Sequence, residues 1–185
     1  MIKYEPLKLR VVGLIPTQRT IQFIMTRVNL VSVEDLADQH LFAEGRELKM
    51  IPAKVRKLWL SNTVNIISMR VNSVPEYTMS TGHVTFFYDK IEWLYRRHLA
   101  LTEELEKRKF NISNYDSYLG FHHGIPGELI GNWKPTIREI KINVGRISER
   151  LHQRPTWYRY YGEIKSPEFF IEKYTQQLFV DTIIA

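Results

Sequence analysis

The stretch TIREIKINVGRISERL, residues 136–151, carries the clearest structural signal in the chain. Its apolar residues recur at a 3-4-3-4 spacing, which is the period of an α-helix with one buried face. These residues are Ile137, Ile140, Val144, Ile147 and Leu151. Pro135 stands where the pattern starts, and Arg154-Pro155 follows its end. The spacing therefore predicts a helix from about Thr136 to Leu151.

Two further segments show the same helical period. The first runs from about Val33 to Leu58, with Ser32 as its predicted N-cap. The second runs from about Asp89 to Lys107. Three main helices with irregular connections predict an all-α fold, a single compact domain.

The segments between and after these helices give weaker signals. Val64–Val71 is strand-like, and a long loop is expected from about Asn111 to Lys134. The tail that follows Ser166-Pro167 predicts one more short helix.

Length and composition limit the class of protein. A chain of 185 residues with 44% hydrophobic residues is long enough for one domain with a real core. No apolar run approaches the ~18 residues needed to span a bilayer, so we expect no membrane protein. The chain has no cysteine, which excludes disulfides, thiolate zinc sites, iron–sulfur clusters and a cysteine nucleophile.

The net charge is +6, from 26 Lys and Arg against 20 Asp and Glu. A basic balance favours a polyanionic partner, most often a nucleic acid. His122-His123 does not predict a metal site, because adjacent side chains rarely converge on one ion and no carboxylate stands at ligand spacing. We therefore expect no metal site at these histidines.

Two helical faces hold candidate functional residues. Glu47 lies at the border of the apolar face of the first helix, where a carboxylate can be aimed by packing, although a solvated glutamate explains it equally simply. Asn143, Arg146 and Arg150 form a stripe that the spacing places opposite the apolar face of the third helix. Such a stripe suits neighbouring phosphates, or is an ordinary solvated basic face.

An aromatic segment, WYRYYG at residues 157–162, follows the third helix. Its rings either stack on unpaired bases or pack into the core. We expect some of these rings to stack on bases and others to pack into the core.

Three blocks together resemble one family: residues 25–48 (MTRVNLVSVEDLADQHLFAEGREL), 82–90 (GHVTFFYDK) and 153–162 (QRPTWYRYYG). The family is the pyrimidine-dimer DNA glycosylase/AP lyase of phages and large algal viruses, the phage endonuclease V type. The resemblance implies a compact all-α domain whose N-terminal segment is threaded between helices. It also implies cleavage of the N-glycosidic bond at UV-induced cyclobutane pyrimidine dimers, followed by nicking at the abasic site through an imine and β-elimination.

The resemblance also assigns roles to residues. The nucleophile, an N-terminal threonine amine, corresponds to Thr26, and the catalytic glutamate corresponds to Glu47. The residues implied in DNA binding are Arg27, Gln39, His40, Arg46, Arg146, Arg150, Trp157, Tyr158 and Tyr160. The implied partner is double-stranded DNA with UV photoproducts or abasic sites, bound by a cytoplasmic monomer that needs no metal or cofactor.

The largest departure from the family lies at the front of the chain. If residue 1 is the N-terminus, Thr26 is internal and its nitrogen is an amide that cannot form an imine. We expect residues 1–24 to be an over-extended gene start, residues 25–163 the glycosylase domain and residues 164–185 a tail. The alternative is a non-catalytic damaged-DNA-binding relative whose nucleophile the extension blocks.

Overall fold

The computed structural model describes residues 28–61, 64–111 and 118–184. Within these ranges the chain is mostly helical, which confirms the predicted all-α class, and the only strands form a two-stranded antiparallel hairpin. The α-helices are α1 (Asp38–Glu47), α2 (Met50–Leu60), α3 (Val64–Asn72), α4 (His83–Phe86), α5 (Ile91–Lys107), α6 (Tyr118–His122), α7 (Ile137–Gln153) and α8 (Pro167–Ile184). The shorter elements are the 3₁₀ turns η1 (Val33–Asp35) and η2 (Gly127–Leu129) and the strands β1 (Arg159–Tyr160) and β2 (Glu163–Ile164).

The second and third predicted helices are confirmed as α5 and α7. Thr136 caps α7: its hydroxyl accepts from the backbone N–H of Glu139, whose carboxylate accepts from the backbone N–H of Thr136. This reciprocal capping box satisfies two donors that a helix start otherwise leaves unpaired.

The first predicted helix is wrong as a single element. Residues 33–58 form η1, α1 and most of α2, with a turn at Leu48 and Lys49. Pro52 explains this turn, because proline has no N–H and its ring clashes with the carbonyl four residues earlier, but it fits the first turn of a new helix. Ser32 does precede η1, yet its hydroxyl donates to Glu34 rather than capping a backbone N–H.

Three weaker predictions also change. The expected strand at residues 64–71 is α3, because the segment packs against α2 and α4 instead of pairing in a sheet. The expected loop from Asn111 to Lys134 contains α6 and η2. The tail is a helix as expected, but at 18 residues α8 is one of the longest and packs along α7.

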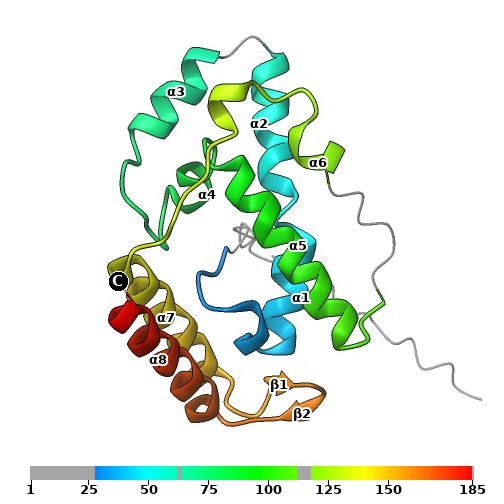
Figure 1. Cartoon of the computed structure of the whole chain (residues 1–185), viewed down its shortest axis with the longest axis vertical. Coiled ribbons are helices and arrows are strands. Elements are labelled where there is room, and N and C mark those ends of the chain that lie inside the picture. Colours follow the sequence, from blue (N-terminus) through cyan, green and yellow to red (C-terminus); the bar gives the residue numbers. More distant parts are fainter. Residues whose placement is uncertain (1–27, 62–63, 112–117, 185) are drawn as a thin grey trace, which may run out of the picture.

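The helix α5 crosses the centre of the molecule, with α1 and α2 on one side of it, while α7 and α8 form a pair at the opposite edge (Figure 1). Its buried residues Ile91, Leu94, Leu101 and Leu105 are part of a continuous apolar core. Phe170 and Tyr174 of α8 are fully buried in the same core, so the tail belongs to the folded body.

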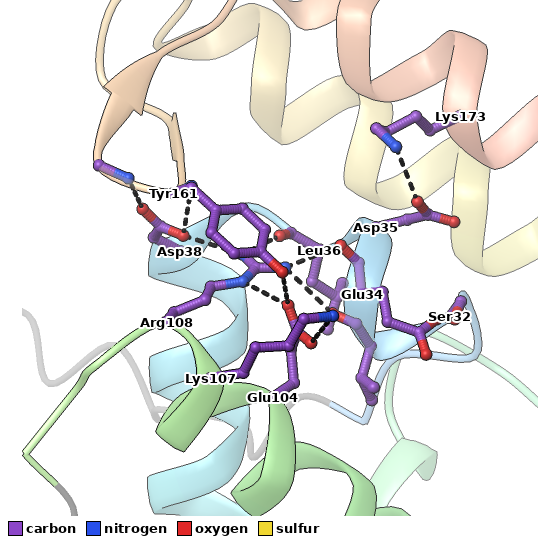
Figure 2. A network of polar contacts seen from close by, with 12 residues as sticks. Ser32, Glu34, Asp35, Leu36, Asp38, Glu104, Lys107, Arg108, Tyr161 and Lys173 are labelled. Atoms are coloured by element: carbon purple, nitrogen blue, oxygen red, sulfur yellow. Dashed lines mark hydrogen bonds and ion pairs between the residues drawn. The ribbon is translucent and has the colours of Figure 1, made fainter.

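Arg108, just after α5, ties four parts of the chain together (Figure 2). Its buried guanidinium donates to Glu104 Oε1 at 2.7 Å and to Asp38 Oδ1 at 2.8 Å, and also to the carbonyl oxygens of Leu36 and Glu34 at 2.7 Å. The hydroxyl of Tyr161 donates to the same oxygen of Glu104 at 2.9 Å. Arg108 thus joins η1, α1, α5 and the hairpin.

Arg108→Met should lower the free energy of unfolding by ~3–5 kcal/mol, because it removes the cation that the buried carboxylates of Asp38 and Glu104 share, while Glu104 keeps the longer ion pair with Lys107 at 3.5 Å. Chemical denaturation measures the loss. The matched control is Arg138→Met, since Arg138 pairs with Glu76 at 3.2 Å while both side chains are about three-quarters exposed. Its cost should stay below ~1 kcal/mol. Equal losses in the two variants would contradict this account.

Candidate active site

Residues Val28 to Val31 form a buried segment without helix or strand that runs between helices. In Figure 1 this blue segment descends while α1, which follows it, rises alongside. Side chains from α1, α4, α5 and α7 bond its backbone in succession. The predicted threading of the N-terminal segment between helices is therefore confirmed for the residues that the structure describes.

The first contact is made by His83 at the start of α4. Its Nε2 accepts from the backbone N–H of Val28 at 3.1 Å, and its Nδ1 lies 2.7 Å from the carbonyl oxygen of Thr78. Because a carbonyl only accepts, Nδ1 carries the proton and the ring is neutral. Burial lowers the pKa of His83 to about 4, which is consistent with this neutral state.

The second contact is a buried ion pair between Glu44 of α1 and Arg97 of α5. Glu44 accepts from the backbone N–H of Asn29 at 3.1 Å and from its side-chain amide at 2.7 Å. Arg97 donates to both carboxylate oxygens of Glu44, at 2.9 and 3.2 Å, and to the carbonyl oxygen of Val31 at 2.8 Å. The pair therefore holds α1, α5 and the threaded segment in one arrangement.

The third contact comes from Asn143 of α7, which accepts from the backbone N–H of Leu30 at 2.9 Å. Asn143 is completely buried, so its predicted place on the face opposite the apolar stripe is wrong. At ~100° per residue, Asn143 lies only ~80° from the centre of the apolar stripe, so the threaded segment packs against it. Arg146 and Arg150 follow on the same side of α7, and Arg146 pairs with Glu149 at 2.6 Å.

Glu47 stands one turn beyond Glu44, at the C-terminal end of α1, and is 8% exposed. Nη2 of the exposed Arg46 lies 3.9 Å from its Oε1. Because the threaded segment runs antiparallel to α1, the end of α1 that carries Glu47 is the end approached by Val28 (Figure 1). Thr26 and Arg27, the predicted nucleophile and its neighbour, lie outside the described residues.

The aromatic segment forms the hairpin, docked on the start of α1. Its turn residues Tyr161 (φ 49°) and Gly162 (φ 81°) are both left-handed, as a two-residue hairpin turn requires. Asp38 accepts from the backbone N–H of both residues, at 3.2 and 2.8 Å. Gln39 bonds the hairpin's other end, donating to the carbonyl of Trp157 at 2.8 Å and accepting from the N–H of Arg159 at 3.0 Å.

The rings of this segment differ in how deeply they are buried. Tyr158 is only 4% exposed and packs on His40 with ring centroids 4.8 Å apart. Trp157 is 48% exposed and lies under the guanidinium of Arg154. Tyr160 is half-buried between Phe169 and the cation of Lys173. Among the described rings of WYRYYG, Trp157 and Tyr161 are therefore the ones that offer large exposed faces.

The sequence analysis missed several residues that build this site: Asp38, Glu44, His83, Arg97 and Arg108. Helical periodicity places Glu44 on the apolar face of α1, three residues after Leu41 and four before Leu48, and a carboxylate on that face was the signal available. Most of their partners lie 15 to 124 residues away in the sequence, so no local pattern identifies those partners.

The described part of the chain contains no cluster of three or more His, Asp or Glu side chains that would hold a metal ion. Among the described helices, none has the length and apolar character to cross a membrane. When the chain is compared with protein families, the family model described as pyrimidine dimer DNA glycosylase matches residues 25–117. This match includes Glu47 and every residue whose side chain bonds the threaded segment except Asn143.

The fold should lose stability as the pH falls from about 6.5 to about 4. Burial lowers the pKa of His83, and that of His98, to about 4, so the unfolded chain binds more protons than the native one in this window. For His83 the loss amounts to about 3 kcal/mol at most. Denaturant unfolding at pH 7, 5.5 and 4 measures it. His83→Gln should flatten the pH dependence, whereas the exposed His123→Gln should leave it unchanged; identical slopes in all three proteins would refute the assignment.

Proposed function

Because the chain belongs to the pyrimidine dimer DNA glycosylase family, we propose that it both cleaves the N-glycosidic bond at the dimer and nicks the strand at the resulting abasic site. The observation that carries this proposal is the threaded segment, which leads the chain toward the end of α1 that holds Glu47. The proposed substrate is double-stranded DNA that contains cyclobutane pyrimidine dimers or abasic sites. The proposed form is a cytoplasmic monomer without metal or cofactor.

The proposed nucleophile is the α-amine of Thr26, freed when Thr26 is the first residue of the mature protein. An α-amine has a pKa of ~7.7–8.0 against ~10.4 for lysine, so a useful fraction is neutral at pH 7. Thr26 stands two residues before Val28, and two residues of chain span at most ~7 Å. The bond from Val28 to His83 therefore anchors the chain close to the proposed amine.

The reaction proceeds in two stages. The neutral amine adds to C1′ of the sugar, and the C1′–N1 bond breaks as its electron pair leaves with the pyrimidine, which takes up a proton. The amine loses a proton, and the C1′–O4′ bond then breaks as O4′ takes up a proton, which opens the sugar ring and leaves a protonated imine at C1′. Removal of a proton from C2′ then expels the 3′ phosphate, which nicks the strand by β-elimination.

Glu47 suits both stages. As a carboxylate it stabilises the positive charge that develops on the sugar, and it then accepts the C2′ proton. Its low exposure strengthens these interactions, because water screens charge less at a buried site.

The proposed DNA contacts come from α1, α7, the hairpin and the residue before Val28. Arg46 and Arg150 extend from α1 and α7, two of the four helices that bond the threaded segment, and Arg146 is available once a phosphate replaces Glu149. Arg27 is proposed for the same role. Trp157 offers an exposed ring, while His40 and Tyr158 pack together behind it and Gln39 positions the hairpin. Tyr160 is proposed to support the hairpin rather than to meet a base.

Borohydride trapping on an abasic-site duplex tests the nucleophile. The protein is expressed from the full reading frame, its N-terminus is determined by intact mass, and the crosslinked residue is mapped by mass spectrometry. We expect a crosslink on the amine of Thr26, because only an imine is reduced to a stable bond. Adding one residue before Thr26 should abolish it. If the mapped N-terminus is Met1 and no crosslink forms, the chain is a damaged-DNA-binding relative instead.

Glu47→Gln should lower single-turnover glycosylase activity on a dimer-containing duplex by at least ~100-fold, because the amide carries no charge and is a poor base. Affinity for the duplex should change little. Glu103→Gln, at an exposed position of α5, is the matched control and should retain full activity. Turnover that survives in Glu47→Gln would remove Glu47 from the mechanism.

A further inference from the structure

We propose that His83 is a positioning residue that holds the proposed amine of Thr26 at the site; this inference rests on the proposed function. His83 makes the contact nearest to Thr26 in sequence among the described bonds to the threaded segment. It lies far from that segment in sequence, 55 residues from Val28, and it has no part in the proposed chemistry.

The proposed role of His83 requires that one ring nitrogen accepts a hydrogen bond while the other donates one. Val28 offers an N–H and Thr78 offers a carbonyl, so the ring must accept at Nε2 and donate at Nδ1. Only the neutral Nδ1–H tautomer meets both partners. An alanine at position 83 would leave the buried N–H of Val28 without its acceptor, which favours displacement of the segment.

The ring itself is held on a rigid support. Tyr77 and Phe87 pack edge-on against it, each with ring centroids 5.5 Å away. The preceding Gly82 has a φ of 101°, and a Cβ there would lie 2.9 Å from Val74. The chain can thus make this turn only with glycine, and the turn places His83 at the start of α4.

The expected effect of His83 on the reaction rate follows from the short stretch of chain between Val28 and Thr26. Only Arg27 separates Val28 from Thr26, so a shift of the Val28 nitrogen displaces the proposed amine by a similar distance. A misplacement of ~1 Å at a reacting group costs up to ~100-fold in rate. Of the residues proposed to bind DNA, only Arg27 adjoins Val28, so affinity should change much less than the rate.

The test measures two quantities in borohydride trapping on an abasic-site duplex: the rate constant at saturating protein and the protein concentration that gives half the maximum. His83→Ala should lower the rate constant at least ~10-fold and change the half-saturating concentration by less than about twofold. His83→Gln should recover the rate to within about threefold, because its amide can both accept and donate near the same positions. The exposed His123→Gln is the matched control and should behave as the unchanged protein.

A second variant removes the donor instead of the acceptor. Replacing the amide between Arg27 and Val28 by an ester deletes the N–H and leaves His83 in place, so it tests the bond even if His83→Ala does not fold. The ester variant should lower the rate constant at least ~10-fold, as His83→Ala does. A normal rate constant in the ester variant or in folded His83→Ala would overturn the proposal, as would folded His83→Gln that recovers nothing. Absence of trapping by the unchanged protein would instead overturn the proposed function, and with it this role.

Discussion

The site depends on one constraint, which is that residues 28–31 are buried without a neighbouring strand, among the described residues, to bond their backbone. Buried backbone N–H and C=O groups need partners, and a strand normally finds them in its neighbours. Here residues 28–31 find theirs in the side chains of His83, Glu44, Asn143 and Arg97. Four helices are thereby tied to one short segment, and its position is specified by all of them together.

A second polar network holds the other side of the site. Arg108 and Asp38 join the end of α5, the start of α1 and the hairpin turn. Charges buried this deeply stabilise a fold only when each is paired and bonded, and here they are. Since α1 carries Asp38 at its start and Glu44 and Glu47 near its end, this one helix connects both networks. The helix α1 therefore fixes the position of the exposed ring of Trp157 relative to the carboxylate of Glu47.

Three errors of the sequence analysis each have a physical explanation. Pro52 divides the first predicted helix, and the apolar period continues across the break because α2 follows α1 along the same core. Asn143 looks like a surface residue because asparagine usually is one; a backbone N–H from residue 30 is what draws it inside. Residues 64–71 contain β-branched side chains, yet without a partner strand they form α3.

The sequence by itself determined the helical class, the positions of α5 and α7, the absence of cysteine chemistry and the blocks that identify the family. These properties are local, since they depend on periodicity, composition and runs of residue types. Only the tertiary structure decided which side chains bond the threaded segment, which rings of the hairpin are buried and which remain exposed. Those outcomes depend on contacts between residues 15 to 124 positions apart, and a chain reveals such contacts only when burial forces each polar group to find a partner.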